Sequence, residues 1–179
     1  MQIVGLDLSL NATGLAWAAN GHTQTETLKP PKGLTGLPRL DWICCQVRER
    51  TATVQLVVME GLSFASKGQM SLERAGLAYA VRLQLWRLTV PFVTVPPSTL
   101  KKFVTGSGKA EKNKMLLEVW RRWHIEAADD NQADAVGLVM IGRALVEPMP
   151  LIQAQVDVIH KIERDNREVL EAVRVRENL

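Results

Sequence analysis

A short apolar run at residues 56–59, Leu-Val-Val-Met, is followed at once by a charged residue, Glu60. A continuous run of this kind predicts a strand buried on both faces, which is typical of a parallel strand inside a sheet. Such a strand needs helices on both sides of its sheet to cover it. The run therefore favours an α/β fold, in which the rest of the chain supplies further strands and two helical layers.

The flanking sequence contains those elements. Residues 2–28 alternate between apolar and polar side chains and predict an antiparallel meander of two or three strands. Another strand is expected at residues 91–95, stopped by Pro96, after which Ser98 is the expected helix N-cap. Helical spacing of apolar residues predicts helices at residues 38–50, 71–88, 110–123 and 129–145. We therefore expect a sheet of mixed direction with helices on both faces.

The length of the chain, 179 residues, is enough for one domain with a hydrophobic core and too short for two ordinary domains. Prolines at positions 148 and 150 are expected to end that domain, which then spans residues 1–147. Residues 148–179 are helical by pattern but highly charged, so we expect a charged helical extension. A solvated helix, a docked helix and a helix paired with a partner all fit this pattern.

The chain lacks the features of a membrane or secreted protein. No stretch reaches the roughly 18 consecutive apolar residues that a membrane helix needs. The apolar N-terminus carries Asp7 and no basic leader, which argues against a signal peptide. The only cysteines, Cys44 and Cys45, are adjacent and are expected to be small core residues of a helix. We therefore expect a protein of a reducing cytoplasm, without a membrane partner.

Carboxylates stand where the apolar pattern predicts burial. Asp7 lies between Leu6 and Leu8 in an apolar strand, and Glu60 ends the apolar run described above. Burying a lone carboxylate costs several kcal/mol unless the group is paired, protonated or bound to a metal ion. Outward-pointing, solvated side chains are the alternative for each acid taken alone. In open α/β sheets ligands gather beyond the ends of such strands, which favours a functional site.

A third group of acids opens the helix expected at residues 129–145. Asp130 and Asp134 are one turn apart and share a helix face, where like charges repel by a few tenths of a kcal/mol unless a cation lies between them. N-capping explains Asp129 or Asp130 equally well, but it explains Asp134 poorly. Hard oxygen ligands suit Mg²⁺ or Mn²⁺. Two such ions about 4 Å apart would activate a water and stabilise the leaving oxygen of a phosphodiester.

The same segments resemble the motifs of RuvC-type Holliday junction resolvases. Residues 5–14, Gly-Leu-Asp-Leu-Ser-Leu-Asn-Ala-Thr-Gly, resemble the first motif of that family, and residues 58–60, Val-Met-Glu, the second. Residues 107–112, Ser-Gly-Lys-Ala-Glu-Lys, resemble its Gly-Ser-Ala-Glu-Lys turn, and residues 132–135 resemble its final motif. The order and intervals agree over roughly residues 2–146. The segment Asp-Asn-Gln-Ala-Asp-Ala most resembles the corresponding segment of phage-borne members, which act in the cytoplasm of a bacterial host.

The resemblance implies an RNase H-like fold with a mixed five-stranded sheet, a homodimer, and cleavage of four-way and other branched DNA junctions by paired nicks. It implies two Mg²⁺ ions per active site, with Mn²⁺ able to substitute, and no small-molecule cofactor. The helix that carries Tyr79, Leu83 and Trp86 is the expected dimer surface. The tryptophans as a group are expected in the core or in that interface.

The resemblance also implies which acids hold the metal ions. Three of them match the family motifs directly: Asp7, Glu60 and Asp134. Bacterial members place a fourth acid three residues from the last of these, where this chain has Asn131. We therefore predict Asp130 as the fourth catalytic ligand, with Asn131 or Asp129 as the alternatives.

A basic stretch at residues 101–124 carries seven basic residues against two acidic ones, a local charge of +5 in a chain whose total is +3. Such lysines can each neutralise a DNA phosphate, although a solvated helix face is the alternative. The predicted DNA contacts are Lys101, Lys102, Lys109, Lys112 and Lys114. Lys112 is expected closest to the chemistry, where it would stabilise the scissile phosphate. Phe64 is predicted to stack on an unpaired base, with a core position as the alternative.

The favoured function is therefore a Mg²⁺-dependent, structure-selective endonuclease. A non-catalytic module that binds branched DNA on the same fold is the alternative, supported by the departure from the family's acid spacing at Asn131. An actin-like ATPase or sugar kinase also begins with a Gly-x-Asp strand, but it would need a second domain and Gly-rich phosphate loops.

Overall fold

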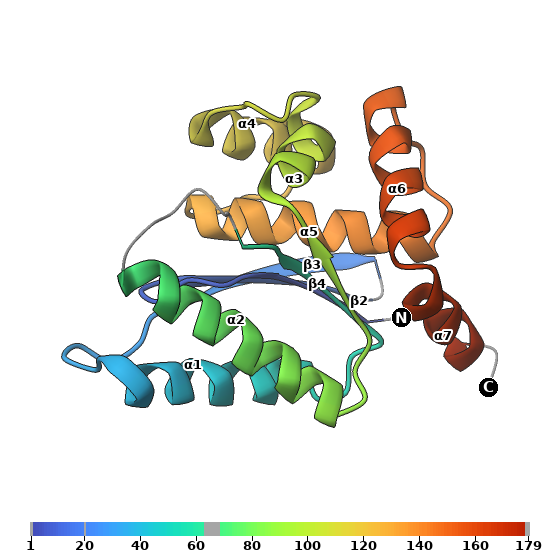
Figure 1. Cartoon of the computed structure of the whole chain (residues 1–179). Coiled ribbons are helices and arrows are strands. Elements are labelled where there is room, and N and C mark those ends of the chain that lie inside the picture. Colours follow the sequence, from blue (N-terminus) through green and yellow to red (C-terminus); the bar gives the residue numbers. More distant parts are fainter. Residues whose placement is uncertain (1, 20, 63–68, 178–179) are drawn as a thin grey trace.

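The computed structural model describes residues 2–19, 21–62 and 69–177, with the side chain left undescribed at a few of these positions, Lys112 among them. A single sheet of five strands has the order β3-β2-β1-β4-β5 (Figure 1). The strands are β1 (Ile3–Asp7), β2 (Thr13–Ala19), β3 (His22–Leu28), β4 (Leu56–Glu60) and β5 (Phe92–Val95). The first three form an antiparallel meander, whereas β4 runs parallel to both β1 and β5. The predicted mixed sheet is confirmed.

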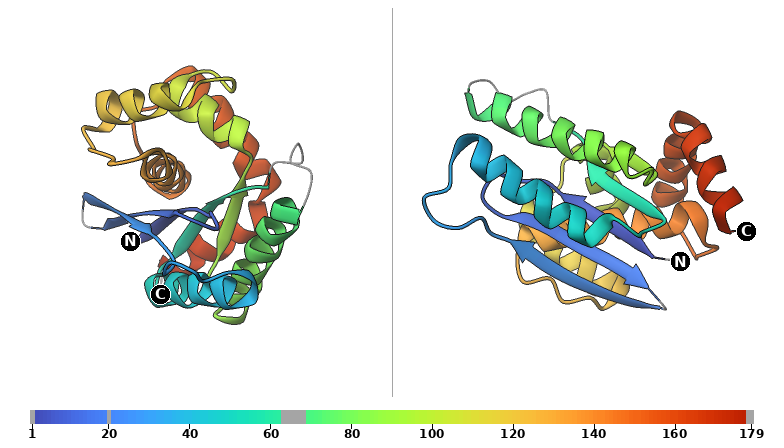
Figure 2. Two further views of the ribbon diagram at one scale, coloured as in Figure 1. Left: turned by 90° about the vertical axis from the view of Figure 1, so that its left-hand side faces the viewer. Right: turned by 90° about the horizontal axis from the view of Figure 1, so that it is seen from below.

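Helices cover both faces of this sheet (Figures 1 and 2). One face carries α1 (Gly36–Thr51) and α2 (Gln69–Arg87). The other face carries α5 (Asp130–Val146), and α3 (Pro97–Thr105) and α4 (Lys112–Trp123) lie beyond α5. Side chains of β4 alternate between the two layers, since Leu56 and Val58 join the α5 core and Val57 and Met59 join the core under α1 and α2. The strand predicted to be buried on both faces is therefore confirmed.

Two glycines bring α5 close to the sheet. A Cβ added at Gly5 of β1 would overlap the carbonyl oxygen of Ala135, and one at Gly14 of β2 would overlap the carbonyl oxygen of Asn131. Any larger residue would push the helix backbone away from these strands. The glycines therefore fix the first turns of α5 directly above β1 and β2.

The C-terminal extension forms two helices, α6 (Gln153–Asp165) and α7 (Arg167–Glu177). Both dock on the domain, because α6 contacts α3 and α5, and α7 contacts α5. Their apolar side chains are buried in the same core as α5: Val158, Ile159, Ile162, Leu170 and Val173. Of the alternatives for this segment, the structure shows a docked one. No helix in the described ranges combines the length and apolar character needed to cross a membrane.

Local expectations differ from the structure at two places, Ser98 and Cys45. The N-cap of α3 is Pro96, and Ser98 lies inside the first turn, because Pro97 occupies the first helical position, where no N–H partner is needed. Cys45 is exposed rather than part of the core. Trp86 and Trp120 were expected in the core or in a dimer interface; both are exposed, at 70% and 52%, so neither lies in the core of the chain.

Candidate functional site

A cleft of about 1100 Å³ opens at the C-terminal ends of β1 and β4. Its lining includes all four acids predicted as ligands: Asp7, Glu60, Asp130 and Asp134. They come from two strands and one helix that are far apart in the sequence. The sequence therefore predicted which acids the fold would gather, and open α/β sheets bind their ligands in this position.

Two of these acids end neighbouring strands. Leu6 pairs with Met59 in the parallel ladder between β1 and β4, so Asp7 and Glu60 follow as the next residue of each strand. Adjacent strands lie roughly 4.8 Å apart, which places both side chains at one edge of the sheet. Asp7 is only 8% exposed, so the fold holds this carboxylate in a largely buried position.

A tight turn after Asp7 explains part of the first motif. The Thr13 hydroxyl donates a hydrogen bond to the Ser9 carbonyl oxygen at 2.8 Å and accepts one from the Ser9 backbone N–H at 3.1 Å. Thr13 is fully buried, and Gly14 follows it under the first turn of α5. The Thr-Gly pair therefore closes the turn and leaves room for α5 above the strand that carries Asp7.

The start of α5 separates a capping acid from the cleft acids. Asp129 is the N-cap, and its carboxylate accepts hydrogen bonds from the Gln132 backbone N–H and the Thr27 hydroxyl, each at 2.9 Å. Asp130 and Asn131 line the cleft, whereas Asp129 does not. N-capping is therefore confirmed for Asp129, and of the three residues predicted as alternatives for a fourth ligand only Asp130 and Asn131 line the cleft.

A hydrogen-bond network holds this helix start to the edge strand β3. The Thr25 hydroxyl donates to Oε1 of Gln132 at 2.9 Å, and Nε2 of Gln132 donates to the Thr27 hydroxyl oxygen at 3.0 Å. Oε1 of Gln132 also accepts a hydrogen bond from the backbone N–H of Ala128. These bonds fix the direction of the first turn of α5, and therefore the positions of the cleft acids on it.

The acids suit a hard divalent cation because all their donors are oxygens. Within residues 2–19, 21–62 and 69–177, however, no three His, Cys, Asp or Glu side chains are grouped so that they could hold a metal ion as they stand. The four acids share one cleft without forming a ready-made ligand shell. A metal site at this position is therefore a proposal.

The predicted DNA contacts fall in different environments. Lys101 lines the cleft. Lys102 instead points to α6, where its Nζ lies 3.3 Å from the Asp157 carboxylate. A hydrogen bond from Gln153, and to a smaller extent one from Lys102, holds the pKa of the Asp157 carboxyl below its usual value. Lys109 and Lys114 are exposed outside the lining of the cleft, whereas Phe64 and the Lys112 side chain lie outside the described parts of the structure.

Two further cations, which the sequence did not predict as site residues, line the cleft. Arg74 and Arg82 project from α2, a helix whose pattern indicated only its apolar sides. By contrast, Arg121 and Arg122 of the basic stretch are both engaged by Glu118, at 3.1 and 3.2 Å. The positive charge at the cleft therefore comes from α2 as well as from Lys101 of the stretch that the sequence indicated.

Comparison with curated proteins finds relatives that share one name. No protein-family model matches the chain. It is 28% identical over 152 residues to the crossover junction endodeoxyribonuclease RuvC of Prochlorococcus marinus strain MIT 9303, a similarity that covers 79% of this chain and 97% of the relative. The protein of the same name from strain MIT 9313 is 26% identical over the same shares of both chains.

Solved structures show the same fold. Thermus thermophilus RuvC matches with a TM-score of 0.63 and 20% identity, over 78% of this chain and 92% of that one. T. thermophilus RuvC in complex with a Holliday junction substrate matches with a TM-score of 0.66 and 21% identity, over 78% and 91% of the two chains. The expected RNase H-like sheet is therefore confirmed.

Proposed function

We infer that this chain is a Holliday junction resolvase of the RuvC type, an endonuclease that cuts four-way DNA junctions. One observation carries this function: four acids from three distant elements line one cleft of a RuvC-like fold, and three of them are the acids of the matching motifs. A structural role alone does not account for acids brought together at the ends of buried strands.

The proposed reaction is hydrolysis of a phosphodiester. Water adds to phosphorus, the bond to the 3′ oxygen breaks, and that oxygen takes up a proton, which leaves a 5′-phosphate and a 3′-hydroxyl. The proposed metal ligands are Asp7, Glu60, Asp130 and Asp134. Two bound Mg²⁺ or Mn²⁺ ions would supply activation of the water and stabilisation of the leaving oxygen. Lys112, at the start of α4, is the proposed cation beside the scissile phosphate.

The rigid supports of the site are part of this proposal. Asp7 is held by the sheet and by the Ser9–Thr13 turn, and the acids of α5 are held by the network around Gln132. Preorganised groups need little rearrangement when charge develops in the transition state. We expect metal binding to draw the carboxylates of the cleft together over a short distance, because their backbones are already adjacent.

We propose that two copies of the chain associate through α2. Large apolar side chains on one face of this helix are exposed: Leu72, Tyr79, Leu83 and Trp86. They recur at helical spacing and form a continuous stripe, which favours burial against a second copy. Two active sites would then make paired nicks across one junction. Light scattering of a Leu83→Glu variant should show monomers where the unaltered protein shows dimers, and a dimeric variant would contradict this surface.

The test of the function is strand nicking of a synthetic four-way junction, with a linear duplex of the same sequence as the control. We expect symmetric nicks in the junction with Mg²⁺ or Mn²⁺, none with EDTA, and little cleavage of the duplex. An Asp7→Asn variant should bind the junction without cutting it. Equal cleavage of the duplex would contradict the junction selectivity, and full cleavage by the variant would contradict the role of Asp7.

A non-catalytic binding module is a second candidate, because no described group of acids is preformed to hold a metal ion and Asn131 stands where the family has an acid. Junction binding without cleavage at any Mg²⁺ or Mn²⁺ concentration would favour it. Cleavage of other branched substrates and action in a bacterial cytoplasm remain predictions that the same assay, with flaps and three-way junctions, and localisation of the protein would test.

A further inference from the structure

The α2 side of the cleft carries two arginines, Arg74 and Arg82. Arg74 is exposed, whereas Arg82 is half-buried. The guanidinium carbon of Arg82 lies 5.2 Å from the centre of the Tyr79 ring, and its Nε is buried without a hydrogen-bond partner. Stacking on the ring limits the rotamers of Arg82. The guanidinium is therefore held against the cleft with part of its hydrogen-bonding capacity unused.

Several other arginines of the molecule are paired with acids. Arg39 pairs with Glu73 at 2.6 Å, Arg50 with Glu26 at 2.7 Å, and Arg143 with Glu147 at 3.0 Å. In the parts of the chain that the structure describes, no carboxylate pairs with Arg74 or Arg82. Holding a guanidinium partly out of water without an acid is unfavourable, and an anionic ligand would recover that cost.

The chemistry of the cleft indicates which anion fits. Four carboxylates in the same cleft disfavour a small carboxylate ligand, whereas a phosphodiester is the substrate of the proposed reaction. The planar fork of a guanidinium matches two phosphate oxygens, which is why arginine is favoured at such contacts. A cationic side of the cleft would also offset the repulsion between the acids and a polyanionic strand.

We propose that Arg82 binds a backbone phosphate of the DNA strand that enters the cleft, and that Arg74 binds another phosphate of the same strand. The two residues are eight positions apart on α2, about 12 Å along its axis, so each serves a different phosphate. This inference rests on the proposed function, since it needs DNA in this cleft. It adds to that function a strand-binding surface on α2, separate from the lysines of α3 and α4.

The test compares Arg82→Gln with Arg48→Gln, because Arg48 is an exposed arginine on α1 outside the cleft. Junction binding is measured in the Asp7→Asn background with EDTA, so that neither cleavage nor metal ions contribute. We expect Arg82→Gln to weaken binding about tenfold and to reduce the salt dependence by about one phosphate. Arg82→Lys should recover part of the loss because it keeps the charge but not the fork. Arg48→Gln should bind like its parent.

A second variant distinguishes a loss of DNA binding from a folding defect. Arg74 is exposed, so Arg74→Gln should fold normally, with an unchanged circular dichroism melt, and should weaken binding several-fold. If Arg82→Gln and Arg74→Gln both bind the junction as Arg48→Gln does, the inference is wrong, while nicking by the unaltered protein would still support the proposed function. If the unaltered protein neither binds nor nicks the junction, the proposed function fails and the inference fails with it.

Discussion

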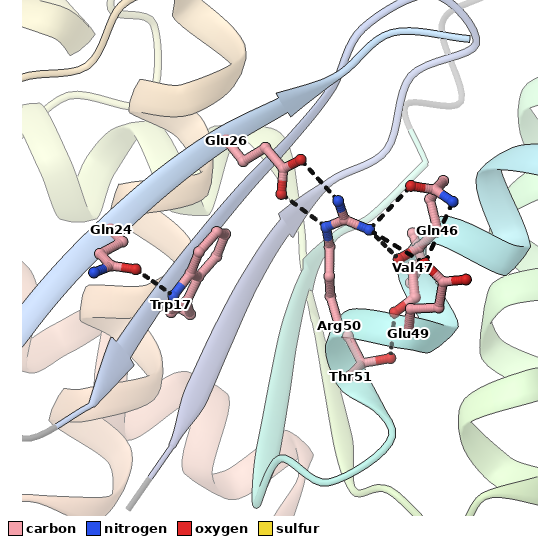
Figure 3. Close-up of polar contacts among 8 residues, drawn as sticks. All are labelled: Trp17, Gln24, Glu26, Gln46, Val47, Glu49, Arg50 and Thr51. Carbon is pink, nitrogen blue, oxygen red and sulfur yellow. Dashed lines mark hydrogen bonds and ion pairs between the residues drawn. The ribbon is translucent and has the colours of Figure 1, made fainter.

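Charged side chains are arranged differently in two regions of the molecule. Where β3 meets α1, Arg50 donates two hydrogen bonds to Glu26, from Nε at 2.7 Å and from Nη2 at 2.8 Å, and a third to the Gln46 carbonyl oxygen (Figure 3). Because the Arg50 guanidinium is hydrogen-bonded to Glu26, its pKa is raised above the usual value. In the cleft, four acids gather from three elements, and the two α2 arginines that line it, Arg74 and Arg82, have no carboxylate partner in the described chain.

The difference separates an ion pair that stabilises the fold from two arginines of the cleft that no carboxylate of the described chain engages. A bidentate arginine–carboxylate pair satisfies both partners and leaves little affinity for a third group. Under the proposed function, the acids of the cleft would bind metal ions and its arginines would bind phosphates. The comparison predicts that changes in the Glu26–Arg50 pair alter stability alone, whereas changes in the cleft alter cleavage or binding.

The largest effect is expected from a matched pair of glutamate variants. Glu60→Gln in the cleft should slow junction cleavage at least about 100-fold, because it removes charge at the reacting centre. Glu26→Gln should leave the cleavage rate within about twofold, since Glu26 only pairs with Arg50. Single-turnover nicking of a four-way junction with Mg²⁺ measures both. Equal losses in the two variants would remove the distinction between the regions.

A change beside the cleft should have an intermediate effect. Gln132→Ala removes the bonds that tie the start of α5 to Thr25 and Thr27, so the acids on α5 lose their fixed position. We expect cleavage to fall about tenfold, because small displacements of catalytic groups are costly. The Mg²⁺ concentration for half-maximal rate should also rise. The control is Gln24→Ala on β3, which removes only a contact with Trp17 (Figure 3). An unchanged rate and Mg²⁺ dependence in Gln132→Ala would show that this network is structural only.

Two adjacent lysines sharpen the comparison further. Lys101 lines the cleft, whereas Lys102 already pairs with Asp157 of α6. Lys101→Ala should weaken junction binding about fivefold and lower its salt dependence, because a phosphate contact is lost. Lys102→Ala should change binding by less than about twofold, since that lysine exchanges one anionic partner for another. Titrations at several salt concentrations distinguish the two, and a larger effect at Lys102 would reverse the assignment.

The smallest effect is expected for the Glu26–Arg50 pair itself. Arg50→Gln should lower the free energy of unfolding by about 1 kcal/mol, a modest figure because both side chains are partly exposed to solvent. Cleavage at temperatures well below the unfolding midpoint should not change. Urea unfolding with the nicking assay tests this prediction. A loss of cleavage without a loss of stability would mean that the pair belongs to the site.

Features encoded locally were predictable from the sequence. Asp7 and Glu60 were recognisable because each interrupts or ends a short apolar run, and strand burial depends on few neighbours. The face of α2 was not predictable in the same way. This helix has two apolar stripes, and the one with Leu77 and Val81 packs on the sheet, whereas the one with Trp86 is exposed. Helical spacing alone does not say which stripe the sheet covers.

Contacts between residues far apart in the sequence were also not predictable. The contact between Thr25 and Gln132 joins residues 107 positions apart, and nothing in the sequence near either one indicates it. Arg82 was equally hidden, because its neighbours along α2 are apolar and its place in the cleft follows from how α2 packs beside the strand ends. The sequence therefore predicted the mixed sheet and the acids that line the cleft, but not the groups that position those acids or the arginines beside them.

The most direct test of this account uses the two adjacent acids at the start of α5. Asp129 caps the helix and Asp130 lines the cleft, so alanine at each position separates folding from chemistry. The measurement is the single-turnover rate of junction nicking with Mg²⁺, with thermal unfolding beside it. We predict that Asp130→Ala slows nicking at least about 100-fold with an unchanged melt. Asp129→Ala should lose about 1 kcal/mol of stability and slow nicking less than tenfold. Normal nicking by Asp130→Ala, with loss of nicking in a stable Asp129→Ala, would contradict the account.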